Sequence, residues 1–102
     1  IGDCPMELVD FSVMSGTYNM AVTRDLMHWE RYMFRCLAKC WDQSRIGMIF
    51  NVLVADKSHI SEGMLYYCEV DKLRRRCIKQ FGTTRIIRER SLPRDATLVI
   101  TR

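Results

Sequence analysis

Few residues of this chain belong to the types that usually carry out chemistry, and those few are widely spaced. The two histidines, His28 and His59, stand alone in the sequence, and the five cysteines include no CxxC pair. Zinc sites are built from clustered cysteine and histidine ligands with short, regular spacings. We therefore expect no metal site, and no cofactor.

The cysteines suggest a structural role instead. The chain starts at Ile1 with Cys4 close behind, as in a mature chain after removal of a leader or in a chain trimmed at its start. A small secreted domain gains from tying down its N-terminus, so we expect Cys4 to form a disulfide. Cys77, in a loop-like segment after residues 74–76, is the candidate partner, although sequence does not fix connectivity. The alternative is that most cysteines are small core residues.

Charge is divided unevenly along the chain. Residues 1–71 carry six Lys/Arg and ten Asp/Glu, a net charge of −4, whereas residues 72–102 carry ten and two, a net charge of +8. A basic region suits an acidic protein, RNA or a membrane surface, and the alternative is a solvated, self-repelling surface. We favour protein, because base stacking needs aromatic side chains and this segment has few. The expected interaction surface comprises Lys72, Arg74, Arg75, Arg76, Lys79, Arg88 and Arg90.

The first half of the chain has the periodicities of a hairpin and a helix. Apolar residues on both sides of residues 15–16, with clean alternation after them, predict a β-hairpin over residues 5–22. Thr23 suits a helix N-cap, and apolar residues then recur every three or four positions. We therefore expect one amphipathic helix over residues 24–41, with Trp29 among its core residues.

Four strand-like segments follow the helix. They are an apolar run at residues 46–55, an aromatic-rich segment at 64–70, and segments at 84–90 and 97–101 that follow a glycine and a Pro-containing turn. At 102 residues the chain should form a single domain. The expected fold is α+β, with an N-terminal hairpin and one main helix packed on a four-stranded antiparallel sheet. No apolar run approaches the roughly 20 residues that span a bilayer, so we expect no membrane partner.

The segments after residue 23 resemble the fungal guanyl-specific ribonucleases in order and spacing. The chain has RIGMIFN, LYYCEV, GTTRII and LVITR. The family has, in that order, a Tyr-Pro-His strand, a Glu-(Trp/Phe)-Pro strand, a Gly-x-x-Arg-(Val/Ile)-(Val/Ile) strand and a strand ending in Ile-Thr-His. The resemblance covers residues 23–102 and implies a ribonuclease-like fold.

The family's catalytic residues are carried over only in part. Its phosphate-steadying arginine matches Arg85, but its glutamate base falls at Tyr67, with Glu69 two residues further on. Its histidines fall at Gly47 and Arg102, and arginine stays protonated, so no residue in a matching place can act as the acid. The resemblance thus implies a remnant of a ribonuclease cleft without catalysis. The alternative is an active ribonuclease that uses Glu69, Arg85 and a displaced acid.

A ribonuclease-like fold without its catalytic set is typical of the RNase-like effectors associated with powdery mildew haustoria. These are about this size and carry a Tyr-x-Cys-type motif near the mature N-terminus, where this chain has Gly2-Asp3-Cys4. The resemblance implies a secreted virulence or avirulence protein that acts in the host cell cytoplasm. Its partner would be a host plant protein or immune receptor, with RNA as a further candidate. An unrelated α+β interaction domain is the remaining alternative.

Overall fold

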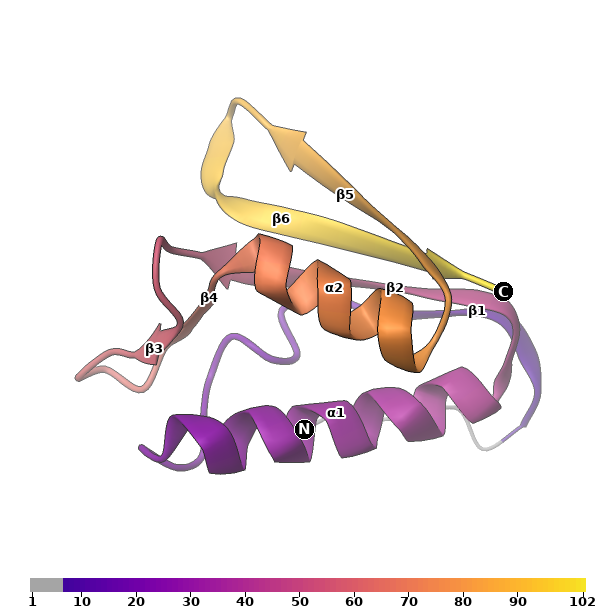
Figure 1. The fold of residues 1–102 in the computed structure, drawn as a ribbon, viewed down its shortest axis with the longest axis horizontal. Helices are drawn as coiled ribbons and strands as arrows, with labels where there is room; N and C mark the ends of the chain where they lie inside the picture. Colours follow the sequence, from indigo (N-terminus) through magenta and orange to yellow (C-terminus); the bar gives the residue numbers. More distant parts are fainter. Residues whose placement is uncertain (1–6) are drawn as a thin grey trace.

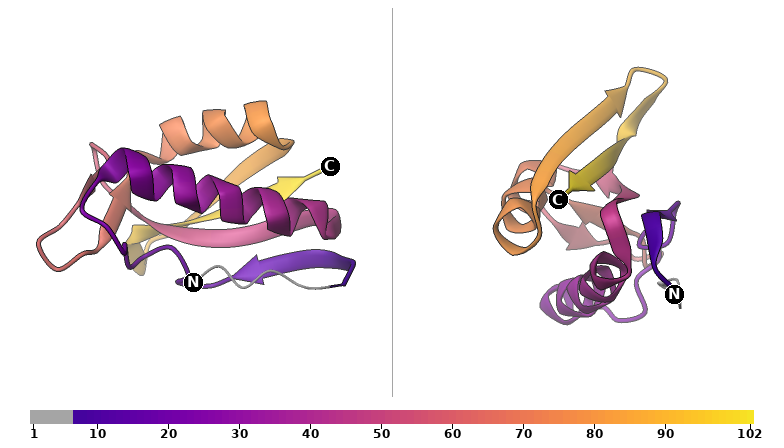
Figure 2. Two further views of the ribbon diagram at one scale, coloured as in Figure 1. Left: turned by 90° about the horizontal axis from the view of Figure 1, so that it is seen from below. Right: turned by 90° about the vertical axis from the view of Figure 1, so that its right-hand side faces the viewer.

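The structure, a computed structural model, describes residues 7–102 and has an α+β architecture with two helices and a mixed sheet. The elements are β1 (Val9–Met14), α1 (Leu26–Asp42), β2 (Ser44–Val54), β3 (His59–Ile60), β4 (Tyr66–Cys68), α2 (Val70–Gln80), β5 (Thr83–Glu89) and β6 (Leu92–Thr101). The strand order is β3-β4-β2-β6-β5, and β1 also pairs with β2. Both helices lie on the same side of this sheet (Figures 1 and 2).

The longest strand, β2, organises the sheet. One of its edges pairs with β6 in antiparallel orientation over seven residue pairs, from Gly47↔Thr101 to Leu53↔Asp95. Its other edge is shared by β1 and β4, both parallel to it, at its two ends. Every second residue in the middle of β2 is buried against the helices, as the alternation of a strand requires. Helix α1 connects β1 to β2 and brings the chain back, so that β2 runs parallel to β1. The sheet is therefore mixed, with parallel and antiparallel pairs.

Helix α1 confirms the helix predicted from the apolar periodicity. Its N-cap is Asp25, rather than the expected Thr23, and the Asp25 carboxylate accepts a hydrogen bond of 3.1 Å from the backbone N–H of His28. Trp29, Met33 and Leu37 are fully buried at successive turns of one helix face. This face rests on the sheet, so the helix is held by packing along its whole length.

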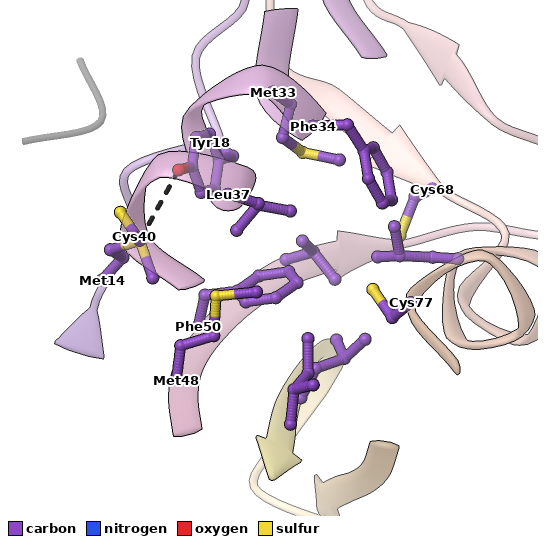
Figure 3. Close-up of a cluster of buried hydrophobic side chains, with 14 of the residues drawn as sticks. Met14, Tyr18, Met33, Phe34, Leu37, Cys40, Met48, Phe50, Cys68 and Cys77 are labelled. Atoms are coloured by element: carbon purple, nitrogen blue, oxygen red, sulfur yellow. Dashed lines mark hydrogen bonds between the residues drawn. The ribbon is translucent and has the colours of Figure 1, made fainter. Parts of the chain in front are cut away.

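The core lies between the two helices and the sheet. Met33 and Leu37 of α1 point toward Phe50 of β2, and Cys77 of α2 enters the same cluster from the side (Figure 3). Ala96, Leu98 and Ile100 complete it from β6. None of the helices in residues 7–102 is long and apolar enough to cross a membrane.

The predicted N-terminal hairpin is wrong. Its first arm is β1, but residues 18–22 form no strand and make only an isolated bridge between Met20 and Leu65. The turn is instead fixed to the central strand, because the backbone N–H of Gly16 donates a hydrogen bond of 2.6 Å to the Asn51 side chain. Tyr18 is then fully buried, and the backbone after it bonds to residues 64–66 instead of β1: the Ala21 N–H donates to the Met64 carbonyl, and the Tyr66 N–H donates to the Asn19 carbonyl, each at 2.8 Å.

The predicted four-stranded antiparallel sheet with one helix is also wrong. The segment expected as a strand over residues 64–70 contains only the three residues of β4, and the basic segment after it forms α2 instead of a loop. Two strands, β1 and β4, run parallel to β2. The strands predicted at residues 84–90 and 97–101 are confirmed as β5 and β6, although β6 begins earlier. The chain is therefore α+β, without the specific layout expected from the ribonuclease resemblance.

Candidate functional site

The four positions taken from the ribonuclease resemblance do not converge. Tyr67 lies between two buried residues of β4, so its ring faces away from the helices, where it stacks on His59 at 5.0 Å. Arg85 is exposed on β5, with β2 and β6 between it and β4. Glu69 is the N-cap residue of α2 and faces the helix side. Glu69 and Tyr67 therefore lie on opposite sides of the sheet.

Arg102, the fourth position, is bound to the end of α1. Its guanidinium donates hydrogen bonds to the carbonyl oxygens of Ser44, at 2.9 Å, and Trp41, at 2.5 Å, and lies over the Trp41 ring at 4.2 Å. Carbonyl groups at a helix C-terminus lack partners within the helix, so a cation there stabilises the helix end. Arg102 therefore has a structural role in this fold.

The predicted basic surface is divided between engaged and unengaged side chains. The Arg74 Nε donates to the Thr84 carbonyl at 3.0 Å, and the Arg88 guanidinium donates to the Pro93 carbonyl at 2.8 Å. The Arg76 guanidinium lies 3.7 Å from the centroid of the Phe34 ring. Arg90 is exposed at the turn of the β5–β6 hairpin, which projects from the body of the molecule (Figure 1).

Three of the unengaged cations form one stripe on α2. Lys72, Arg75 and Lys79 are exposed and follow each other at spacings of three and four residues, which places them along one side of the helix. Within residues 7–102 the only ion pair joins Arg45 and Asp10, at 3.7 Å. None of the three side chains of this α2 stripe therefore forms an ion pair with a carboxylate of residues 7–102.

A cleft of about 550 Å³ separates the N-terminal half of α1 from α2. Its lining includes the apolar residues Leu26, Phe34 and Leu73 together with charged residues. Sequence reasoning missed it, because its residues come from two helices, the β2–β3 loop and the end of β4. The residues that line the cleft are Leu26, Met27, Glu30, Phe34, Lys57, Ser58, Cys68, Glu69, Lys72, Leu73 and Arg76.

One carboxylate of the cleft is already engaged. Glu30 accepts a hydrogen bond of 2.6 Å from the hydroxyl of Tyr66, which is fully buried. Burial, reinforced by this hydrogen bond, raises the pKa of Tyr66 far above its usual value, so the hydroxyl keeps its proton and remains a donor. Glu30 is thus held against β4 by a bond to a buried group.

The cysteines do not provide a reactive group in this region. Cys77 is a free, fully buried thiol on α2, so the prediction that Cys77 forms a disulfide is wrong. Cys4, its predicted partner, lies outside the described residues. Burial raises the pKa of both Cys68 and Cys77 to about 12, which keeps them as neutral thiols. Cys40 on α1 is disulfide-bonded.

The sheet face opposite the helices is partly apolar. The pairing register places Val13, Ile49 and Val99 in one row across three adjacent strands, and Val13 is 69% exposed. No helix within residues 7–102 covers this face (Figure 2). Its apolar row gives the molecule a second distinct surface besides the helix side.

Comparison with known proteins adds no relative. No family model, no curated protein and no solved structure matches this chain. Within residues 7–102, no three His, Cys, Asp or Glu side chains are grouped in a way that could hold a metal ion. The surfaces of the molecule that could support a function are the α2 stripe, the cleft and the open sheet face.

Proposed function

We propose that this chain is a non-catalytic binding domain that uses the α2 stripe to contact an acidic protein surface. The observation that carries the proposal is the exposed row of Lys72, Arg75 and Lys79, which has no carboxylate partner among residues 7–102. Unpaired cations on a rigid helix attract an acidic partner during encounter and fix its orientation. The helix is anchored beneath them by buried Leu73 and Cys77.

A protein partner is favoured over RNA because the stripe has no aromatic platform. Phe34 is only 3% exposed and is covered by Arg76, while its other neighbour, Phe81, stacks with it. Single-stranded RNA binding relies on exposed rings on which the bases stack. The half-buried Tyr67 ring faces the opposite side of the sheet, so it cannot serve the stripe.

The wider biological role remains a prediction from sequence resemblance. That role is a secreted fungal effector, ribonuclease-like in fold, that acts in the host cell cytoplasm and meets a plant protein or immune receptor. The α2 stripe is compatible with a protein partner of this kind. The binding function can be tested without assuming the source of the chain.

The test measures binding of an oligoglutamate and an oligouridine of equal formal charge. We expect the oligoglutamate to bind, and the variant Lys72→Glu/Arg75→Glu/Lys79→Glu to weaken binding by about tenfold or more, with a smaller difference at high salt. The control Arg88→Glu/Arg90→Glu changes charge on the β5–β6 hairpin and should bind as the wild type does.

Two outcomes would overturn the proposal. If the oligouridine binds more tightly than the oligoglutamate and the stripe variant abolishes that binding, the surface recognises RNA. If the stripe variant binds both probes as the wild type does, the stripe is only a solvated helix face. Circular dichroism of each variant verifies that the fold is intact.

A further inference from the structure

The cleft between α1 and α2 has the volume of a small-molecule site. Its volume of about 550 Å³ falls within the range of pockets that bury drug-sized ligands. Leu26 and Leu73 supply apolar surface from the two helices, and Phe34 also lines the cleft, with the Arg76 guanidinium over its ring. Cys68 adds to this surface as a buried thiol. An apolar moiety would therefore be favoured inside the cleft.

The charged groups of the cleft favour an anion. Three cations line it, Lys57, Lys72 and Arg76, against two carboxylates, Glu30 and Glu69. One oxygen of Glu30 accepts the hydrogen bond from the Tyr66 hydroxyl. Glu69, the N-cap residue of α2, makes no side-chain capping hydrogen bond. The cations thus exceed the carboxylates that oppose them.

Two of the polar groups are held in position before any ligand arrives. The Arg76 guanidinium is fixed over the Phe34 ring at 3.7 Å, and its planar fork can still donate to an oxyanion at its edge. The Ser58 hydroxyl oxygen accepts a hydrogen bond of 2.9 Å from the Glu69 backbone N–H, which leaves its own O–H available as a donor. Groups that are ordered in advance lose less entropy on binding.

We propose that this cleft binds a small amphipathic anion. Its carboxylate, phosphate or sulfonate group lies among Lys57, Lys72 and Arg76, and its apolar body contacts the apolar residues that line the cleft between α1 and α2. This site overlaps the α2 stripe at Lys72, and its other lining residues lie outside the stripe. The inference therefore holds whether or not the stripe binds a protein.

The test uses 8-anilinonaphthalene-1-sulfonate, whose fluorescence increases in an apolar site and which carries a single sulfonate. We expect saturable binding at one site. The variants Arg76→Ala and Lys57→Ala should each weaken binding by about tenfold, because each removes a charge-assisted contact to the sulfonate. The matched control is Arg75→Ala, which removes the neighbouring arginine that does not line the cleft, and it should bind within about twofold of the wild type.

Further arms locate the probe and define the anion. The neutral analogue N-phenyl-1-naphthylamine should bind at least about tenfold more weakly than the sulfonate, because it lacks the charged group. Dodecanoate and dodecyl phosphate should displace the probe, and their relative strength distinguishes a carboxylate from a phosphate ligand. Arg76→Lys keeps the charge without the planar fork, so it should retain part of the affinity even if Arg76→Ala is poorly folded.

Three results would overturn the proposal. The first is equal loss of binding in Arg75→Ala and Arg76→Ala, which would indicate a general charge effect. The second is equal binding of the charged and neutral probes. The third is loss of binding in Val13→Ser, a change on the opposite sheet face, which would place the probe there.

Discussion

At the scale of single residues, Trp29 is the main anchor of α1. It is fully buried, and its ring contacts both Tyr32, at a centroid distance of 5.6 Å, and Tyr66, at 6.4 Å. Its indole N–H has no hydrogen-bond partner among residues 7–102, so packing is the source of its contribution there. The same residue was predicted as a core residue from sequence, and this prediction is confirmed.

The first prediction concerns this anchor. Trp29→Ala should lower the free energy of unfolding by about 3–5 kcal/mol, because it removes a large buried aromatic side chain. The control is Met27→Ala on the same helix, where the side chain is 69% exposed, and it should change stability by less than about 0.5 kcal/mol. Urea denaturation measures both. An unchanged midpoint in Trp29→Ala would contradict the packing described here.

The second prediction concerns the buried thiols and alkaline pH. Folding raises the pKa of Cys68 and Cys77 from 9.0 to about 12. Above pH 9 the unfolded thiols lose protons that the folded thiols retain, so stability falls as the pH rises and is unaffected by these groups below pH 9. The urea midpoint should therefore decline between about pH 9 and pH 10. In Cys68→Ala/Cys77→Ala the decline should be shallower; an identical decline would contradict the assignment.

At the scale of elements, the contact between β2 and β6 depends on Gly47. A Cβ atom at this position would collide with the carbonyl oxygen of Ile100 on β6 and would lie 3.2 Å from the Phe11 ring. Gly47 is also the position at which the ribonuclease resemblance would place a histidine. The close approach of the two strands excludes any side chain there, which gives a physical reason for the glycine.

The third prediction follows from this approach. Gly47→Ala should destabilise the protein by about 1–3 kcal/mol or more, because the strands must move apart to admit the methyl group. Gly63→Ala is the matched control, since the nearest atom to its added Cβ is the Ser61 hydroxyl oxygen at 3.9 Å. Thermal denaturation of the two variants compares them directly. Equal stability of Gly47→Ala and the wild type would show that the β2–β6 register adjusts freely.

At the scale of the whole molecule, the fold separates the residues that a ribonuclease would need together. Tyr67 and Arg85 lie on different strands, with β2 and β6 between those strands, Glu69 lies on the helix side, and Arg102 is bound at the end of α1. General acid–base catalysis requires its groups within hydrogen-bond reach of one substrate. No such arrangement connects these four positions.

The fourth prediction is that pure protein does not cleave RNA at guanosine. Labelled RNA should remain intact under both oxidising and reducing conditions, because no acid and base converge on one phosphate. The variant Arg85→Ala should be indistinguishable from the wild type. Turnover by the wild type that disappears in Arg85→Ala would contradict this prediction and would favour the ribonuclease alternative.

The sequence by itself determined the elements whose signal is local. The apolar stripe from Trp29 to Leu37 predicted α1, and the long apolar run predicted β2, because neighbouring residues alone define these periodicities. The concentration of positive charge after residue 71 was also visible in the sequence. The α2 helix was missed because only Leu73 and Cys77 are buried in it, and charged residues surround them. The four-residue spacing of Leu73 and Cys77, within a run of good helix formers, was the feature of the sequence that indicates this helix.

Only the tertiary structure decided how these elements meet. Strand partners and directions depend on contacts between distant residues, so the parallel pairing of β1 and β4 with β2 could not be deduced from local alternation. The same is true of the cleft, whose cations come from the β2–β3 loop and from α2. Two arginines that are adjacent in sequence, Arg75 and Arg76, acquire different environments because the helix turns about 100° between them. Arg75 faces solvent, and Arg76 is held over Phe34 beside the cleft.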